Sequence, residues 1–396
     1  MTIDTFANER TILALETSCD ETAAAVVRGG RVVLSNIVAS QIDEHRRYGG
    51  VVPEVASRQH ILALDAVVGA ALAVLPGGWD AIDAVAATNG PGLSGALLTG
   101  LNAAKGLAWA RGLPFVGVNH IEAHIYANWL DADDSKFKIQ NPELLSPVPA
   151  PLFPVVALVV SGGHTLLALL EDHGRYRLLG QTRDDAAGEA FDKTARIMGL
   201  GFPGGPAIEQ AASGASSAVT LPRAWLRDSY DFSFSGLKTA VLHQVQAHND
   251  REAKVQVVAS KNMPSRTGDG RRKMENRAQD DAPPSTVHRP PSTSDKFTIQ
   301  LAHAFQESVV DVLVTKAVDA ARAFGATEIL LAGGVAANTR LREELRRRST
   351  VPVRFPPIAL CTDNAAMVAA AAHYRFASGV QSNWALDVNP NLKLGA

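Results

Sequence analysis

The stretch Thr22-Ala-Ala-Ala-Val-Val27, which continues after a glycine turn as Gly30-Arg-Val-Val-Leu34, decides the fold because its pattern occurs twice. The second copy is Thr165-Leu-Leu-Ala-Leu-Leu170, which continues as Gly174-Arg-Tyr-Arg-Leu178. Each apolar run has the length of a buried strand, and each follows another such run that ends in a polar turn. A duplicated β-β-β-α unit predicts an α/β architecture of the actin-like ATPase type. Such a fold has two similar lobes of mixed β-sheet flanked by helices, with the active site in the cleft between them.

Hydrophobic periodicity supplies the other elements of both lobes. We expect strands near 12–15, 82–87, 115–118, 155–160 and 328–332, and helices over 53–75 and 95–110. The segment 251–295 has no aromatic residue, five prolines and charges of both signs, which predicts a disordered insertion. The expected domains are an N-terminal lobe over 1–130, a loop insertion over 131–151 and a second lobe over 152–362, with a C-terminal helix at 363–396 that packs back on the first lobe.

The composition is that of an ordinary globular protein. Of the 396 residues, 46% are hydrophobic and 20% are charged, and the formal net charge is -2. Nothing global indicates nucleic-acid binding, so contact with RNA would need a local basic patch. The cysteines Cys19 and Cys361 predict a reducing compartment rather than a disulfide framework. The first residues lack an apolar run, and no run of about 18 apolar residues occurs. We therefore expect a cytoplasmic chain without a signal peptide or a membrane span.

His120 and His124 carry the clearest chemical signal. Two imidazoles four residues apart on a helix lie on one face and can share a metal ion. In a metallopeptidase the glutamate follows the first histidine directly, whereas Glu122 would point away from the metal. The alternative is a helix with two ordinary polar histidines. Asp363 is a third candidate ligand, and two imidazoles with one carboxylate favour Fe(II) or Zn(II), although an aspartate at a helix start is often a cap.

Four further motifs each have a binding and a structural interpretation. The glycines of Ser161-Gly-Gly-His-Thr165 either let backbone N–H groups approach an anion or form a tight turn. Asp192 either holds a ribose hydroxyl or stabilises a helix start. The turn Pro203-Gly-Gly-Pro206 is either a ligand wall or a rigid loop, and Asn338 either binds a ligand or caps a helix.

The most basic short stretch of the expected folded core is one helix near the C-terminus. Basic residues at the end of a helix complement its dipole, and they are also candidate contacts for RNA phosphates. The residues concerned are Arg340, Arg342, Arg346, Arg347 and Arg348.

The order of the motifs is more specific than any one of them. Along the chain come Glu16-Thr-Ser-Cys-Asp-Glu-Thr22, Asn89-Gly-Pro-Gly92, His120-x-x-x-His124, Ser161-Gly-Gly-His-Thr165, Gly188-Glu-Ala-Phe-Asp-Lys-Thr194, Pro203-Gly-Gly-Pro206, Ser233-Phe-Ser-Gly-Leu-Lys238, Gly333-Gly-Val-Ala-Ala-Asn338 and Cys361-Thr-Asp-Asn364. From Thr11 to Ser378, apart from the two insertions, this order resembles the bacterial type of the universal tRNA N6-adenosine threonylcarbamoyltransferases, formerly described as O-sialoglycoprotein endopeptidases. The resemblance implies an acyltransferase that moves a threonylcarbamoyl group from threonylcarbamoyl-AMP to the exocyclic amine of the tRNA adenosine next to the anticodon.

The resemblance also implies site residues, a cofactor and partners. One divalent metal, Fe(II) ahead of Zn(II), would be held by His120, His124 and Asp363. Asp20 and Glu21 match positions that transfer needs, and their separate roles stay open. The implied partners are tRNA, a smaller paralogous subunit and an ATPase subunit, with the helices at 53–75 and 93–110 either as the interface or as core helices. The implied substrate contacts are Val159, Val160, Ser161, Gly162, Gly163, Asp192, Gly205 and Asn338.

Elementary chemistry agrees with this interpretation. Aminolysis of a mixed carbamoyl-phosphate anhydride needs a polarised carbonyl and two reactants held in line, without a covalent enzyme intermediate. A metal can act as the Lewis acid, the loop at 161–163 can donate to the developing oxyanion, and Asp20 or Glu21 can accept the proton of the amine. The competing interpretations are a metallopeptidase, a kinase or chaperone of the same fold that binds ATP, and a non-catalytic scaffold. The displaced Glu122 argues against a metallopeptidase, and the lack of a distinctive sugar site argues against a kinase. The complete set of metal-ligand candidates argues against a scaffold.

Overall fold

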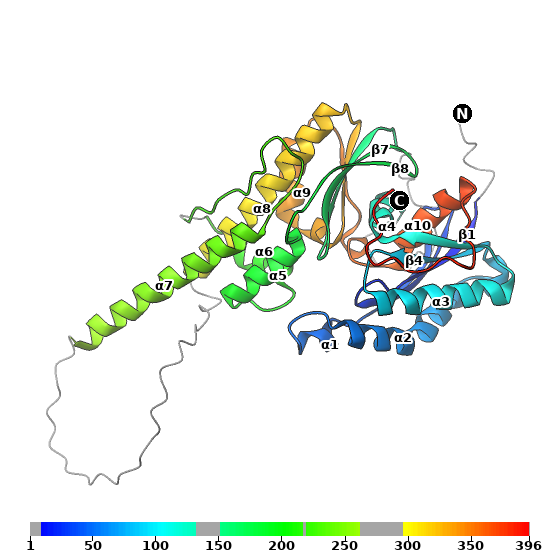
Figure 1. The fold of residues 1–396 in the computed structure, drawn as a ribbon, viewed down its shortest axis with the longest axis horizontal. Coiled ribbons are helices and arrows are strands. Elements are labelled where there is room, and N and C mark those ends of the chain that lie inside the picture. The colour runs from blue at the N-terminus through cyan, green and yellow to red at the C-terminus, as the bar shows by residue number, and fades with distance from the viewer. Residues whose placement is uncertain (1–8, 132–150, 217–218, 262–295, 396) are drawn as a thin grey trace, which may run out of the picture.

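Two five-stranded sheets of identical topology form the core of the molecule (Figure 1). The computed structural model describes residues 9–131, 151–216, 219–261 and 296–395. The first sheet has the order β3-β2-β1-β4-β5, and the second has the order β10-β9-β6-β7-β8. The predicted duplication is therefore confirmed. The strands are β1 (Thr11–Glu16), β2 (Glu21–Arg28), β3 (Val32–Ser40), β4 (Ala84–Gly90), β5 (Phe115–Asn119), β6 (Val155–Val160), β7 (Thr165–Asp172), β8 (Arg175–Gln181), β9 (Glu328–Ala332) and β10 (Val353–Arg354).

Helices cover the faces of both sheets (Figure 1). The helices of the first half are α1 (Ile42–Arg46), α2 (Pro53–Ala73), α3 (Ser94–Arg111) and α4 (His120–Tyr126), with short 3-10 turns η1 (Gly78–Ala81) and η2 (Ala127–Trp129). Those of the second half are α5 (Ala187–Met198), α6 (Gly204–Ala212), α7 (Ser235–Lys261), α8 (Lys296–Ala323), η4 (Gly334–Ala337), α9 (Thr339–Arg348), η5 (Ile358–Leu360) and α10 (Ala365–Ala377).

The central strand of each sheet explains why its sequence is apolar throughout. Strand β1 pairs antiparallel with β2 and parallel with β4, and all of its residues are buried because α3 and α10 both contact it. Strand β6 repeats this arrangement with β7 and β9. A strand covered on both faces reads as a continuous apolar run rather than an alternating one. The turn between β2 and β3 uses Gly29 and Gly30 at φ angles of 61° and 69°, as the glycine pair predicts.

The last helix returns to the first sheet. Helix α10 packs on β1, β2 and α4, and its residues share one hydrophobic cluster with strands of both sheets. The expected helix at 363–396 is shorter than predicted, because α10 ends at Ala377 and the remaining tail runs along β5 without helical structure. We propose to divide the molecule into an N-terminal lobe of residues 1–130 together with α10, and a second lobe over 152–362.

Part of the expected disordered insertion is helical. Residues 251–261 continue α7, which projects away from the rest of the molecule in Figure 1. The stretch is rich in Ala, Glu, Lys and Gln, which favour helix wherever no Pro or Gly intervenes. The rest of that insertion, 262–295, and most of the insertion at 131–151 lie outside the described residues.

Helix α2 has the length and hydropathy of a membrane span, and it is the one described helix that meets this criterion. Core helices meet the same criterion. The inner face of α2 packs against β2, β3 and α3, and Asp65 interrupts its apolar sequence. Its outer face carries Ile61 and Leu62, which are 66% and 75% exposed.

A buried carboxylate joins the two halves of the molecule. Glu122 of α4 accepts hydrogen bonds from the Tyr176 hydroxyl of β8 at 2.8 Å and from Nη1 of Arg375 in α10 at 2.9 Å. The side chain of Glu122 is 2% exposed. A carboxylate at this depth needs its partners, since an unpaired buried charge is strongly unfavourable.

We predict that Arg375→Ala lowers the free energy of unfolding by about 2–4 kcal/mol, because it leaves the Glu122 carboxylate without its cation. The matched control is Arg175→Ala, which removes an exposed ion pair with Glu171 and is expected to cost less than about 1 kcal/mol. Urea unfolding followed by circular dichroism measures both. Equal losses in the two variants would contradict the role given to Arg375.

Candidate active site and metal centre

The three predicted metal ligands come together in the structure. The candidate ligand atoms of His120, His124 and Asp363 lie within 4.8 Å of one another. Atom Nε2 of His124 is 3.1 Å from Oδ1 of Asp363, and Nε2 of His120 is 3.6 Å from the same oxygen. Both imidazoles therefore direct the same nitrogen at one carboxylate oxygen, as expected for three groups that surround one ion.

Two asparagine caps hold these ligands in place. The Asn119 side chain accepts from the N–H groups of Ile121 and Glu122, which starts α4 at His120. Asn364 accepts from the N–H of Met367 and starts α10. The cap of α10 is therefore not Asp363, for which the sequence had left a capping role open. Because the neighbouring Asn364 satisfies the helix, the Asp363 carboxylate can face the histidines.

The donor set fits a divalent metal ion. Both ring nitrogens of His124 are buried, and within the described part of the chain neither meets the geometry of a hydrogen bond, although Nε2 lies 3.1 Å from the Asp363 carboxylate. Buried polar atoms normally have hydrogen-bond partners, so an ion between His124 and Asp363 would give Nε2 a ligand. Two imidazoles and one carboxylate form a set that Fe(II) and Zn(II) both accept, with further positions for substrate or water.

Two residues at the end of β1 orient the first histidine, and their role was not predicted from the sequence. Nδ1 of His120 is 3.2 Å from Oε2 of Glu16 and 3.1 Å from Oγ of Ser18. Glu16 is fully buried and also accepts from Oγ1 of Thr88 at 2.6 Å. A carboxylate behind a ligating histidine fixes its tautomer and leaves Nε2 for the metal. The signal was present in the motif that begins at Glu16, but spacing alone does not show which carboxylate faces an imidazole.

Charge pairing sets the protonation of this group in the metal-free protein. Burial lowers the pKa of His120, but the carboxylates of Asp363 and Glu16 outweigh it and raise that pKa to about 9. Burial opposes ionisation of Glu16 as well, and His120 nevertheless holds the pKa of this carboxyl below its usual value. The pKa of Asp363 is also depressed, since His120 and His124 together outweigh its burial.

The loop after β1 adds two more carboxyl groups. Asp20 directly precedes β2 and Glu21 is the first residue of that strand, and both are half-buried. Burial, followed by the negative charges of Asp363 and Asp20, raises the pKa of Glu21 to about 10. Glu21 is therefore protonated at neutral pH and is a hydrogen-bond donor rather than a base.

The glycine loop after β6 offers its backbone to a ligand. Gly162 and Gly163 are exposed, and a Cβ on either would meet open space. Gly188, by contrast, is packed so tightly on this loop that a Cβ would lie 2.6 Å from the Ser161 carbonyl oxygen. His164 closes the turn, and its burial, followed by the charges of His120 and His124, lowers its pKa to about 4. No separate role was predicted for His164, which the structure places within electrostatic reach of the candidate metal ligands.

The other predicted substrate contacts differ in what they can offer. The side chains of Val159 and Val160 are fully buried in β6, so that a ligand could meet their backbone only. Oδ1 of Asp192 accepts from the N–H of Gly204 at 2.6 Å, which joins α5 to the start of α6 beside Gly205. Asn338 caps α9 through Oδ1 and donates from Nδ2 to Gln306 at 3.0 Å. Its polar atoms thus already have partners inside the protein.

Comparison with known proteins identifies the family. Residues 32–370 match the family model described as tRNA N6-adenosine threonylcarbamoyltransferase. A protein of that name from Thermomicrobium roseum is 53% identical over 385 residues, which cover 97% of this chain and 96% of the relative. The chain belongs to the tRNA N6-adenosine threonylcarbamoyltransferase family.

Further comparisons agree with this membership. The tRNA N6-adenosine threonylcarbamoyltransferase of Geobacillus thermodenitrificans is 47% identical over 388 residues, covering 97% of this chain and 96% of the relative. A solved structure of full-length HypF has a TM-score of 0.51 and 13% identity, and the match covers 96% of this chain and 48% of HypF. This likeness confirms the predicted two-lobed, actin-like fold and carries nothing about function.

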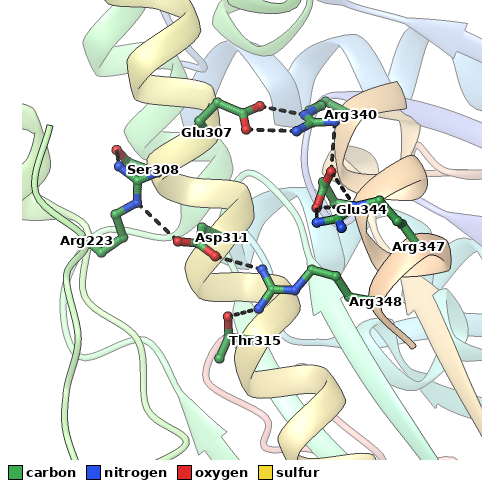
Figure 2. Close-up of polar contacts among 9 residues, drawn as sticks. All are labelled: Arg223, Glu307, Ser308, Asp311, Thr315, Arg340, Glu344, Arg347 and Arg348. Atoms are coloured by element: carbon green, nitrogen blue, oxygen red, sulfur yellow. Dashed lines mark hydrogen bonds and ion pairs between the residues drawn. The ribbon is translucent and has the colours of Figure 1, made fainter. Parts of the chain in front are cut away.

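In this member of the tRNA N6-adenosine threonylcarbamoyltransferase family, the predicted basic patch is a helix-to-helix contact. Figure 2 shows Arg340 between Glu307 and Glu344, Arg347 on Glu344, and Arg348 on Asp311 of α8. Arg223 reaches the same Asp311 at 3.2 Å. Outside this figure, Arg346 stacks on Phe355 at 4.2 Å. Phosphate contacts by Arg340 and Arg348 would have to compete with ion pairs that join α9 to α8, so the structure favours the interpretation that these two stabilise the fold. Arg347 pairs within α9, and its side chain is 68% exposed.

We predict that metal binding releases about one proton per ion between pH 7 and 8, because His120 with a pKa of about 9 carries a proton in the metal-free protein and must lose it to ligate. The apparent affinity should rise about tenfold per pH unit in this range. Calorimetric titration with Zn(II) in two buffers of different ionisation enthalpy measures the release. A buffer-independent heat for the wild type would contradict the assignment, and His120→Ala is the control without the titrating group.

Proposed function

We propose that the chain transfers the threonylcarbamoyl group of threonylcarbamoyl-AMP to the exocyclic amine of the tRNA adenosine next to the anticodon, at the site built on α4. The observation that supports this proposal is the convergence of His120, His124 and Asp363 in a chain of this family. The family places the chain among acyltransferases that modify tRNA. The site residues, the metal and the partners are the parts that this proposal adds.

The transfer is one substitution at a carbonyl. The amine nitrogen of adenosine forms a bond to the carbamoyl carbon, and the bond from that carbon to the phosphate oxygen breaks. AMP leaves with the electron pair of that bond, and the amine loses a proton to a base. No covalent enzyme intermediate is needed, so the protein has to align two reactants and stabilise the developing oxyanion. The exposed backbone of Gly162 and Gly163 is the proposed source of N–H donors for that charge.

We propose that His120, His124 and Asp363 hold one divalent metal, Fe(II) or Zn(II), with Glu16 and Ser18 fixing His120 behind it. When bound, the metal would supply Lewis-acid polarisation of a phosphate or carbonyl oxygen of the substrate. The protein's own contribution is a rigid, buried cradle, in which asparagine caps set where both ligand-bearing helices start.

The two carboxyl groups of the 20–21 loop have different proposed roles. In the metal-free protein the pKa of Glu21 is about 10, so Glu21 is protonated at neutral pH, and its proposed role is to donate a hydrogen bond to a substrate oxygen. Asp20 is therefore the proposed base that accepts the amine proton. This proposal gives each residue a separate role, whereas the sequence left both as candidate catalytic groups.

Nucleotide binding is proposed for the second lobe. One carboxylate oxygen of Asp192 accepts a hydrogen bond from the N–H of Gly204, and the other oxygen is the proposed partner of a ribose hydroxyl. Burial raises the pKa of Asp192, and the charge of Asp20 from the other lobe adds to this rise. Gly205 and Asn338 would form the adjoining walls.

A partner subunit is proposed for the outer face of α2 and α3. Ile61 and Leu62 are 66% and 75% exposed, and Leu98 of α3 is 41% exposed. Adjacent exposed apolar side chains on two packed helices are typical of an interface. A smaller paralogous subunit that adds two helices to this pair is the proposed occupant, with an ATPase subunit and tRNA completing the assembly.

We predict that Asp20→Asn lowers the rate of transfer by about 10²–10⁴-fold, the usual contribution of a general base, whereas Glu21→Gln, which keeps a donor in place, stays within about threefold of wild type. Single-turnover transfer to tRNA at saturating threonylcarbamoyl-AMP and about pH 7.5 measures both variants. A larger loss for Glu21→Gln than for Asp20→Asn would reverse the two roles.

We predict that His124→Ala loses the metal and transfer activity together while the fold is kept, because one of three ligands is missing. Metal content by mass spectrometry, circular dichroism and transfer activity are measured in parallel. His243→Ala on the exposed face of α7 is the matched control. Stoichiometric metal in a His120→Ala/His124→Ala double variant would refute the site. Peptide hydrolysis by wild type without transfer would favour the metallopeptidase instead.

A further inference from the structure

The loop between β1 and β2 is held by three donors from three different elements. The Ser18 carbonyl accepts from the N–H of Leu93 at the start of α3, at 2.8 Å. The Asp20 carbonyl accepts from the N–H of Gln41, at 3.0 Å. Between them, the Cys19 carbonyl accepts from Nε2 of His60 on α2, also at 3.0 Å. Of these three donors, that of Cys19 is the one supplied by a side chain.

His60 belongs to a buried polar network beneath this loop. It is 0% exposed, on the inner face of α2. Its Nδ1 lies 2.8 Å from Oγ1 of Thr22 and 3.3 Å from Nε2 of Gln41. Oε1 of Gln41 is 3.2 Å from Nε2 of His45, and Nδ1 of His45 accepts from the N–H of Val52 at 3.3 Å.

The fixed partners at both ends give the network one direction. A carbonyl oxygen only accepts, so His60 carries its proton on Nε2 and its Nδ1 is an acceptor. Gln41 must then donate from Nε2 and accept at Oε1, which makes His45 a donor at Nε2 as well. The backbone N–H of Val52 satisfies the remaining nitrogen of His45. Each group donates towards the Cys19 carbonyl, and such chains strengthen their members by mutual polarisation.

We propose that His60 is a positioning residue for transfer: its Nε2–H holds the Cys19 carbonyl and thereby sets the position of the Asp20 carboxylate. This inference rests on the proposed function, in which Asp20 is the base. His60 itself contacts no substrate. A displacement of about 1 Å of a group that must meet a reacting atom costs on the order of 10²-fold in rate, so the position of this loop bears directly on catalysis.

A merely structural role explains the network less well. A buried imidazole is costly to desolvate, and an apolar side chain would fill the same space without partners. The network instead ends on a loop that carries a proposed base, adjacent to the metal ligands. Burial lowers the pKa of His60, which keeps the ring neutral and its Nδ1 available as an acceptor at physiological pH.

The test compares His60→Leu, His60→Gln and Val68→Ala in the complete complex, with wild type alongside. Leucine fills the space without a donor, and glutamine can place an amide N–H where Nε2 lies. Val68→Ala removes buried packing from the same helix without touching the loop. We expect His60→Leu to lower the single-turnover rate about 100-fold and His60→Gln to remain within about tenfold of wild type. KM for both substrates and the metal content should be unchanged, and Val68→Ala should lose stability but keep its rate.

Three outcomes overturn the inference: an unchanged rate in His60→Leu, no rescue by glutamine, or the same fall in rate for Val68→Ala at equal folded fraction. Where His60→Leu does not fold, Gln41→Met decides. It keeps the backbone donor to Asp20 and removes one of the two side-chain groups at Nδ1 of His60, while Thr22 stays. A smaller loss in rate at unchanged KM is therefore expected, and an unchanged rate refutes the inference. An inactive wild-type complex would instead refute the proposed function, and this inference would fall with it.

Discussion

The meeting of two imidazoles with the Asp363 carboxylate is the interaction on which the rest of the site depends. Asp363 and α4 are far apart in the sequence, and they meet because α10 returns across β1 and packs on α4. The duplicated sheets make this possible, since each presents polar turns at the end of its central strand. Glu16 closes β1 beneath His120, and the Ser161 loop closes β6 on the other side. A metal here would therefore be bound by one lobe and face the loop of the other.

Electrostatics favours a cation at the candidate site. Glu16, Asp20 and Asp363 gather within a small region, and an anionic substrate such as threonylcarbamoyl-AMP would be repelled by them. In the metal-free protein a proton on His120 offsets part of this charge, and a second proton keeps Glu21 neutral. Exchange of the His120 proton for a divalent ion makes the region more positive by one further charge. These carboxylates repel an anionic substrate, but they also favour binding of a cation. That cation would in turn attract the substrate.

The sequence predicted the architecture because its signals are local. Apolar runs, glycine turns and the histidine spacing each depend on residues close together in the chain, and the duplication follows from comparing two such stretches. The contacts that the sequence did not predict depend on which of several neighbouring polar side chains forms a given helix cap or ion pair. Asn364 rather than Asp363 caps α10, so the Asp363 carboxylate faces His120 and His124. Arg347 pairs with Glu344 of α9, and Arg348 pairs with Asp311 of α8. The run of positive charge therefore does not form an open basic surface. Helix α7 extends past the expected start of the insertion because helix propensity continues there.

Helix α2 connects the proposed interface with the proposed chemistry. His60 and Ile61 are neighbours in sequence, yet one lies 0% exposed beneath the Cys19 carbonyl and the other 66% exposed on the outer face. A rigid helix transmits any displacement from one face to the other, because its side chains share one backbone. A subunit that binds the outer face would therefore also fix the donor that holds the loop of Asp20. Dependence of transfer on a partner then needs no residue from that partner in the active site, since restricting the motion of α2 is sufficient to keep the base in place.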